Sequence, residues 1–251
     1  MGETMIMFDV CEGVHTVVHG DTNCYVIESD NGLTLVDAAY PSTWDLVQRC
    51  LDSLRRSTDD IRGLIVTHGH FDHLGFAASV QQRFGVPVWV HPGDFPLAAH
   101  PYGYRPERPR LLYPLAYPRS LPVLTRMVAA GALRVSGFTP DRELQPDAVL
   151  DLPGRPQVIA TPGHTDGECV FLLADRRILL TGDALVTLDP YTGFRGPRII
   201  ARAATHDSRQ ALKSVASLAT LGVDHVLPGH GEQWQHGIES AVRSALQNGG
   251  R

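Results

Sequence analysis

Lysine is almost absent from this chain of 251 residues: Lys213 is the only one, and the other 21 of its 22 basic residues are arginine. We attribute this bias, with the abundant alanine, glycine and proline, to a GC-rich coding sequence. The formal net charge is −5, so the chain as a whole has no attraction for nucleic acid or an anionic membrane. We therefore expect neither as a partner.

Cysteine is also scarce, and the four residues Cys11, Cys24, Cys50 and Cys169 are scattered without a Cys-x-x-Cys pair. This excludes a disulfide scaffold, and we expect buried reduced thiols. No apolar run is long enough for a transmembrane helix, and the first residues lack the pattern of a signal peptide. We therefore expect a cytoplasmic protein. The Gly-x-Ser-x-Gly motif of serine hydrolases is missing too.

Hydrophobic residues make up 43% of the chain and charged residues 20%, which is typical of a folded globular protein. We predict a single domain over residues 1–251. Residues 92–140 differ in composition because they are rich in proline, tyrosine and arginine. We predict a loop-and-helix insertion there, with a helix near Pro122–Ala130.

Elsewhere, short β-prone segments alternate with helical patterns. The predicted strands are Val14–Val18, Cys24–Glu28, Leu33–Val36, Ile61–Val66, Val86–Val90, Gln157–Thr161, Val170–Ala174, Ile178–Thr181 and Asp224–Leu227. The predicted helices are Ser42–Ser57 with Ser42 as its cap, His73–Phe84 ended by Gly85, Asp207–Leu221 stopped by Gly222, and Ile238–Gln247. Asp30-Asn31-Gly32 predicts a hairpin turn. This order fits two packed sheets with helices on both outer faces, although other layered α/β folds fit it as well.

The segment Thr67-His68-Gly69-His70-Phe71-Asp72-His73 places three histidines and an aspartate within six residues, directly after a predicted strand. Only 12 residues of the chain are histidine, so chance clustering is improbable. On an extended loop His68 and His70 point the same way, while Asp72 and His73 enter a helix and can face a second point nearby. Imidazole nitrogen and carboxylate oxygen are kinds of ligand that suit zinc. A solvated polar loop is the alternative interpretation.

Three later residues also follow short apolar runs. His164 lies in Thr-Pro-Gly-His-Thr, Asp183 in Thr-Gly-Asp and His230 in Pro-Gly-His-Gly. Sites in α/β sheets gather at such strand ends. Alone, each has a plainer explanation, as a hydrogen-bonded histidine or a turn aspartate. Together with the first motif, they indicate a metal site.

This combination resembles the metallo-β-lactamase superfamily, whose signature is His-x-His-x-Asp-His followed by a distant His, an Asp and a final His. The match runs from the region of Asp37 to His230. The resemblance implies an α/β fold, the αββα sandwich of two mixed sheets flanked by helices. It implies one metal held by His68, His70 and His164, a second held by Asp72, His73 and His230, and Asp183 bridging the two. Asp37 matches the family's acid behind the ligands, although a strand-end turn is a competing interpretation.

The ligand types imply hydrolysis. Two metal ions ~3.5–4 Å apart can share a water and lower its pKa toward ~7, so that a bridging hydroxide is the nucleophile. We expect two Zn²⁺ ions, with Fe or Mn as alternatives, and a small-molecule ester, thioester or lactone as substrate. Asp72 is expected to be catalytic as well as a ligand, because its free oxygen can orient the hydroxide or move a proton.

Two branches of the superfamily share this ligand set. Glyoxalase II-like thioesterases carry a C-terminal helical region with basic residues that bind glutathione. In this chain the only lysine or arginine residues after His230 are Arg243 and Arg251. Quorum-lactone hydrolases have a tyrosine shortly after the bridging aspartate; Val186 stands near that place here, and Tyr191 is the nearest substitute. We predict a member close to these branches.

Other functions stay open. An iron-dependent oxidoreductase of the persulfide-dioxygenase type resembles the same motif but uses one iron held by two His and one Asp, and a non-catalytic binding module is a third possibility. Five arginines in loops suggest an anionic or aromatic acyl substrate: Arg105, Arg108, Arg110, Arg195 and Arg198. A solvated lid or a homodimer contact is the alternative for these loops.

Overall fold

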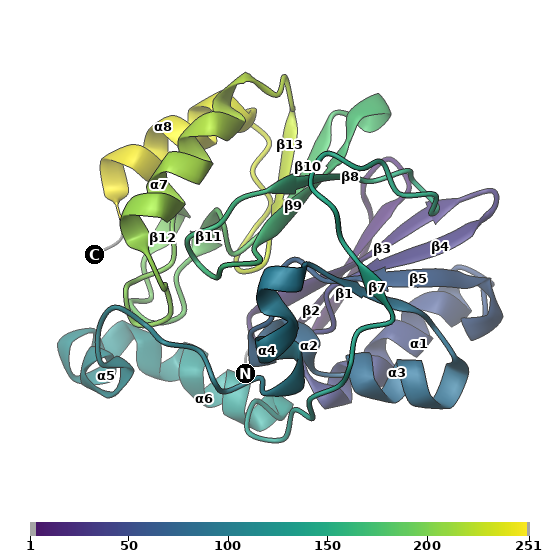
Figure 1. Cartoon of the computed structure of the whole chain (residues 1–251), viewed down its shortest axis with the longest axis horizontal. Helices are drawn as coiled ribbons and strands as arrows, with labels where there is room; N and C mark the ends of the chain where they lie inside the picture. The colour runs from purple at the N-terminus through teal and green to yellow at the C-terminus, as the bar shows by residue number, and fades with distance from the viewer. Residues whose placement is uncertain (1–3, 250–251) are drawn as a thin grey trace.

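The computed structural model describes residues 4–249, in which two β-sheets pack face to face with helices outside them (Figure 1). The first sheet has the strand order β1-β2-β3-β4-β5-β6-β7, with β1 (Met5–Cys11), β2 (Val14–His19), β3 (Thr22–Ser29), β4 (Gly32–Val36), β5 (Ile61–Ile65), β6 (Val88–Val90) and β7 (Arg142–Glu143). The second has the order β13-β10-β9-β8, with β8 (Gln157–Ala160), β9 (Cys169–Leu173), β10 (Ile178–Gly182) and β13 (His225–Pro228). A separate pair joins β11 (Val186–Leu188) to β12 (Arg195–Arg198).

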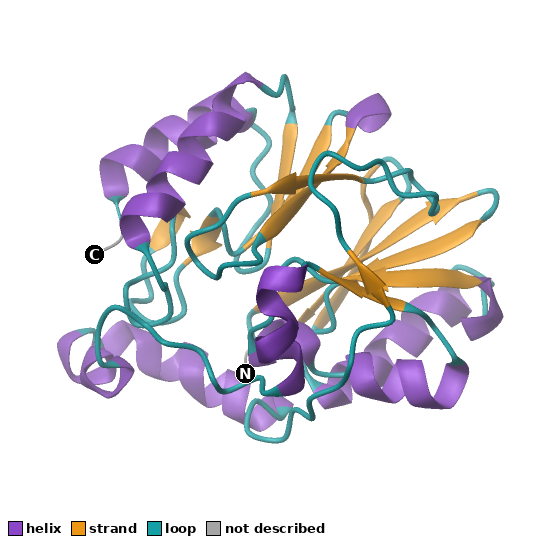
Figure 2. Cartoon of the chain, viewed as in Figure 1, coloured by secondary structure: helices purple, strands orange, loops and turns teal. Residues whose placement is uncertain are grey.

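The helices cover the outer face of each sheet, as Figure 2 shows. Their bounds are α1 (Trp44–Ser53), α2 (Phe71–Leu74), α3 (Ala77–Phe84), α4 (Phe95–Ala99), α5 (Tyr113–Ala116), α6 (Leu121–Ala130), α7 (Ser208–Ser217) and α8 (Ile238–Asn248). Residues of α1, α3 and α6 pack against the first sheet, and residues of α7 and α8 pack against the second. No helix in the described part of the chain is both long and apolar enough to cross a membrane.

The alternation of side chains along the strands explains the four layers, because successive residues of a strand face opposite sides. In β3, Val26 packs with the outer helices, whereas Ile27 faces the other sheet. In β9, Val170 packs with α7 and α8, whereas Phe171 faces the first sheet. The inner strands of both sheets are therefore buried on both faces, and the predicted αββα sandwich is confirmed.

Both sheets are mixed, as predicted. In the first sheet, β1 to β4 are antiparallel and β4 to β7 are parallel. In the second, β10 is parallel to β13 and antiparallel to β9. Parallel neighbours bring their carboxyl ends to the same edge of a sheet, so the loops after β10 and β13 start side by side. These loops carry Asp183 and His230.

Several local predictions are confirmed. Residues Asp30 and Asn31 connect β3 to β4, with Ser29 paired to Gly32. Gly85 ends α3 in the left-handed conformation, at φ 65°. The helix predicted from Asp207 is α7, and the structure adds that the Asp207 side chain caps it by accepting a hydrogen bond from the backbone N–H of Gln210. All four cysteines are buried and unpaired, which agrees with the expected reduced thiols.

Two predicted helices are wrong in extent. The first begins as a 3-10 turn, Pro41–Thr43, and α1 ends at Ser53; Ser42 is not its cap, because its hydroxyl donates to the carbonyl of Ala130 at 2.7 Å. The predicted helix His73–Phe84 is divided into α2 and α3. At the break, the N–H of Gly75 donates to Ala39 and not to the preceding turn, and a Cβ on Gly75 would lie 2.2 Å from the backbone of Tyr40.

Four strands were not predicted: β1, β7, β11 and β12. The strand β7 has only two residues, and β12 contains a glycine and a proline, so neither shows the usual strand pattern. Residues 92–140 contain α4, α5 and α6, and α6 matches the predicted helix near Pro122–Ala130. That the chain is a single domain with an insertion stays a prediction.

Candidate metal centre

Loops from both sheets bring polar side chains to one place. The His-x-His-x-Asp-His segment follows β5, and His164 follows β8, while Asp183 and His230 follow β10 and β13. All seven predicted ligands are buried: His68, His70, Asp72, His73, His164, Asp183 and His230. Their ligand atoms form three groups, each within 4.8 Å: His68, His70 and His164; His68, His73 and Asp183; and Asp72, His73 and His230.

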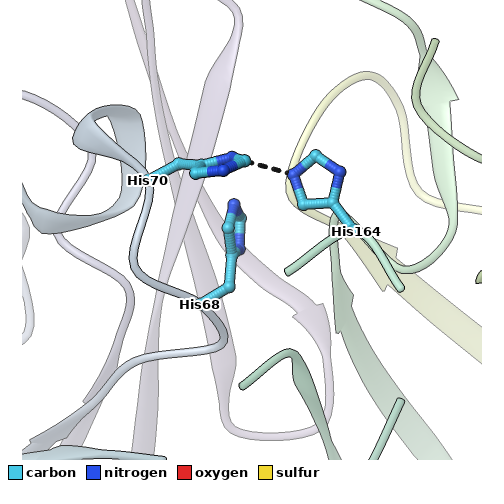
Figure 3. Close-up of side chains that lie close together, drawn as sticks. All are labelled: His68, His70 and His164. Carbon is cyan, nitrogen blue, oxygen red and sulfur yellow. Dashed lines mark hydrogen bonds between the residues drawn. The ribbon is translucent and has the colours of Figure 1, made fainter. Parts of the chain in front are cut away.

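The first group is a set of three imidazoles that face one another (Figure 3). Nδ1 of His70 lies 3.0 Å from Nε2 of His164. The ring centroid of His68 lies 4.8 Å from those of both other histidines. We call these residues the three-histidine half of the centre.

The last of the three groups combines two histidines with a carboxylate, and we call it the acidic half: Asp72, His73 and His230. Nε2 of His230 lies 3.3 Å from Oδ2 of Asp72.

Asp183 lies between the two halves. Its Oδ2 is 3.5 Å from Nε2 of His164, which belongs to the three-histidine half, and 3.4 Å from Nε2 of His230, which belongs to the acidic half. Its Oδ1 is 3.5 Å from Nε2 of His73. A carboxylate in this position contacts both groups, as a bridging ligand must.

Several atoms at the centre are buried without a hydrogen-bond partner among residues 4–249: Nε2 of His68, His73 and His230, and Oδ1 of Asp183. Each such atom costs ~1–3 kcal/mol, and native structures seldom leave them unsatisfied. Cations at this point would satisfy them together, since imidazole nitrogen and carboxylate oxygen are ligands for zinc and related metals. The residues present therefore fit a two-metal site.

The opposite ring nitrogens of these histidines are held in place. Nδ1 of His73 contacts Oδ2 of Asp37 at 2.8 Å, and Nδ1 of His230 contacts the carbonyl of Asp21 at 2.8 Å. Two hydroxyl groups play the same part for the other rings: Oγ1 of Thr205 lies 3.2 Å from Nδ1 of His164, and Oγ1 of Thr67 lies 3.1 Å from Nδ1 of His68. Such contacts orient a ring and favour the tautomer whose inner nitrogen is a free ligand.

Asp37 stands behind His73, as predicted. Its Oδ1 also accepts the backbone N–H of Thr67 at 2.7 Å, so one carboxylate connects the start of the ligand loop to a ligand ring. The backbone of Asp37 is left-handed, at φ 61°, which aspartate tolerates better than most residues.

Burial dominates the electrostatics of the three-histidine half. It lowers the pKa of His70 and of His164 to about 3, and it lowers the pKa of His68 well below its ordinary value. These rings are therefore neutral at pH 7, and their lone pairs are available.

Carboxylates dominate the acidic half. Burial alone would lower the pKa of His230, but Asp183 and Asp72 outweigh it and raise this pKa to about 10. For His73, Asp37 and Asp183 outweigh burial in the same way and raise its pKa. Burial would raise the pKa of Asp183, but His230 and His73 hold it well below its usual range. This half favours positive charge.

The family described as the metallo-beta-lactamase superfamily matches residues 17–230 of the chain. The chain belongs to this superfamily. It is 26% identical over 236 residues to the probable metallo-hydrolase YflN of Bacillus subtilis, covering 89% of this chain and 86% of YflN. It is 27% identical over 165 residues to the hydroxyacylglutathione hydrolase GloC of Haemophilus influenzae, covering 65% of this chain and 66% of GloC. The predicted family is confirmed, while the likeness to a glyoxalase II-type enzyme is more limited.

Solved structures of the metallo-β-lactamase superfamily share the fold. One is TTHA1623 in a di-iron-bound form, with a TM-score of 0.64 and 24% identity over 92% of this chain and 96% of that chain. Another is LRA-12 from an Alaskan soil metagenome, a class B3 di-zinc enzyme, with a TM-score of 0.60 and 18% identity over 87% of this chain and 75% of that chain. These two similar structures thus hold pairs of different metals, iron in one and zinc in the other.

Two buried acids at the metallo-β-lactamase centre were missed in the sequence. Oε2 of Glu168 lies 3.3 Å from Nδ1 of His68, and its Oε1 accepts the backbone N–H of Asp183 at 3.1 Å. Asp94 accepts the N–H of Gly69 at 2.7 Å and that of Gly167 at 2.8 Å, which ties two ligand loops together. Both acids contact residues that are distant in sequence, so no local sequence motif predicts them.

Gly229, beside the ligand His230, is required by space. A Cβ there would lie 2.5 Å from Oδ1 of Asp183 and 2.8 Å from Cε1 of His73. The Pro-Gly-His-Gly segment therefore lets the backbone approach the centre closely.

The five loop arginines occupy different places. Arg105 lines a cavity of about 300 Å³ together with His70 and His164. The guanidinium of Arg110 lies 4.8 Å from the ring centroid of Tyr104. The other three have contacts elsewhere: the N–H of Arg108 donates to Arg202, Arg195 pairs with Glu232 at 3.6 Å, and Arg198 lies over the ring of Phe194.

Proposed function

We propose that this protein is a two-metal hydrolase that cleaves an ester, thioester or lactone bond in a small molecule. One observation carries the proposal: the carboxylate of Asp183 lies between two groups of buried ligand atoms, several of which have no other partner in the described residues. The matching superfamily and the relative YflN, a probable metallo-hydrolase, support hydrolysis.

His68, His70 and His164 would hold one cation, Asp72, His73 and His230 the other, and Asp183 would contact both. When bound, the two cations supply Lewis acidity and lower the pKa of a water toward ~7. Water then adds across the acyl bond: its oxygen joins the carbonyl carbon, the C–O or C–S bond breaks, and the leaving alcohol or thiol gains a proton. No oxidant or reductant is consumed.

Asp72 is proposed to move that proton. Its carboxylate lines a small cavity beside the centre with Asp183 and His230. Oδ2 faces His230, so the other oxygen can accept a proton from water and pass it to the leaving group.

The proposed substrate is an acyl compound that is anionic or aromatic. Arg105 and the exposed His206 line the larger cavity and can bind a carboxylate. Pro96, Leu97 and Tyr104 supply apolar surface in the same cavity. The similarity to the hydroxyacylglutathione hydrolase GloC is consistent with an acyl substrate.

Zinc is the proposed metal, and the di-zinc LRA-12 supports it. The di-iron form of TTHA1623 makes iron the rival. The test combines metal analysis of protein purified without added metal with a panel of lactones, thioesters and aryl esters, each assayed with and without a chelator. We expect two metal ions per chain and hydrolysis that the chelator stops and zinc restores. One iron per chain with oxygen consumption would favour the persulfide-dioxygenase type of activity, and chelator-resistant hydrolysis would overturn the proposal.

A further inference from the structure

Tyr104 lies over the metal centre although it comes from the predicted insertion. Its ring centroid is 4.2 Å from that of His70, with the planes inclined by 42°. Its hydroxyl is 3.1 Å from the hydroxyl of Tyr191, which lies beyond β11. The guanidinium of Arg110 lies on the ring as well, at 4.8 Å from the centroid.

Two cavities adjoin the ring of Tyr104, and His70 and Ala204 line both of them as well. The inner one reaches the ligands Asp72, Asp183 and His230 and has a volume of only about 10 Å³. That is close to the room that one water molecule needs. The outer one, of about 300 Å³, reaches the centre only along its His70 and His164 side. Tyr104 lines both.

An acyl substrate that enters the outer cavity therefore meets Tyr104 before it meets the acidic half of the centre. A carbonyl group does not fit in the inner cavity while the ring is in this position. Rotation of the ring away from His70 would join the two cavities into one.

The side chain, and not the whole loop, is the part that can move. The backbone is held on both sides: the N–H of Gly103 donates to His100 at 2.8 Å, and the N–H of Glu107 donates to Thr205 at 3.0 Å. The hydroxyl is held by Tyr191 and by the nearby Arg110, both through side-chain contacts that rotation breaks and water can replace.

We propose that Tyr104 is a gate that controls access from the outer cavity to the metals and selects substrates by their acyl group. When the gate is open, the ring forms a wall of the joined cavity. Flat or aromatic acyl groups stack on this wall, whereas bulky branched groups collide with it. This inference rests on the proposed function, because it assumes metals at the centre and an acyl substrate.

The first test measures access without any substrate. Zinc-loaded protein is mixed with excess EDTA, and the rate of zinc release is followed for the wild type, Tyr104→Ala and Tyr104→Phe. We expect Tyr104→Ala to release zinc roughly tenfold faster, the scale of losing one aromatic contact and one hydrogen bond, and Tyr104→Phe to show a smaller increase. Zinc stoichiometry should not change. Tyr117→Ala is the matched control, because Tyr117 belongs to the same segment and packs against Tyr113 and Phe194.

The second test measures selection. Tyr104→Ala should raise kcat/KM for bulky acyl esters relative to aryl esters, while Tyr117→Ala should leave this ratio unchanged. Tyr191→Phe, which removes the same hydrogen bond from the other side, provides a second variant if Tyr104→Ala unfolds. Equal release rates in wild type, both Tyr104 variants and Tyr191→Phe would overturn the gate. Zinc binding without hydrolysis would reject the proposed function but leave the release test decisive, and a chain that binds no zinc would reject both.

Discussion

The two halves of the metal centre use the same side chain in opposite electrostatic settings. In the three-histidine half, burial lowers the pKa of His70 and His164 to about 3. In the acidic half, Asp183 and Asp72 overcome burial and raise the pKa of His230 to about 10. Imidazole is thus neutral on one side and protonated on the other, and the number of nearby carboxylates makes the difference.

The comparison teaches which half needs a cation more. The three-histidine half offers free lone pairs at neutral pH. The acidic half gathers Asp72 and Asp183 around His230, and these carboxylates favour a proton on His230 or a cation in its place. Asp183 belongs to both settings, so variants at and around this residue separate the two halves.

The largest expected effect is that of Asp183→Ala, which removes the contact common to both halves. Hydrolysis should fall roughly 10³-fold or more, because a shared ligand matters more than outer partners, whose loss costs 10–100-fold. Metal analysis and steady-state kinetics measure the change. Asp175→Ala, at an exposed turn, is the matched control. A variant with full metal content and activity would refute the bridging role.

The next largest effect is expected from variants of Glu168 and Asp37, the acids that contact one histidine in each half. Glu168→Gln weakens the support of His68, and Asp37→Asn weakens that of His73. Each should lower the affinity about 10–100-fold for the metal on the side of the histidine that it contacts, and less for the other metal, because Glu168 also holds the backbone of Asp183 and Asp37 also holds Thr67. Chelator competition, which resolves two binding constants, reports this. If both variants mainly weakened the same constant, the division into halves would be wrong.

A smaller effect is the pH dependence of stability in the metal-free chain. His230 has a folded pKa raised to about 10, so its contribution is complete below the ordinary value of 6.5 and is lost as pH rises toward 10. His70 and His164 have folded pKa values lowered to about 3, so their contribution is complete above 6.5 and is lost as pH falls toward 3.

Melting temperatures of the metal-free chain between pH 5 and 9 should therefore be highest near neutral pH. Zinc held by His230 would take the place of its proton, so the loss on the alkaline side should shrink in zinc-loaded protein. A metal-free chain whose stability rises steadily up to pH 9 would contradict the assignment of His230.

The smallest effect concerns the cavity beside the three-histidine half. Arg105→Ala should raise KM for an anionic substrate a few-fold, the scale of one exposed charge contact, and leave kcat unchanged. A neutral substrate of the same size should show no change. Arg108→Ala is the control, because Arg108 belongs to the same segment but is not among the residues that line this cavity. Equal effects of the two variants would remove the role of Arg105 in recognition.

Much of the fold was open to prediction because its signals are local. Strand alternation, the turn at Asp30 and Asn31, and the end of α3 at Gly85 depend on neighbouring residues. The division between α2 and α3 was not open to prediction. There the N–H of Gly75 donates to the carbonyl of Ala39, a residue distant in sequence.

The sequence by itself determined the kinds of side chain proposed as metal ligands, their order along the chain, and the family that this order indicates. Only the tertiary structure decided what surrounds them. Glu168 reaches His68 across 100 residues of chain, and Tyr104 meets Tyr191 across 87. A ligand motif can be recognised because its residues have a fixed spacing along the chain. Contacts such as those of Glu168 and Tyr104 arise where separate segments pack together, so no spacing in the sequence predicts them.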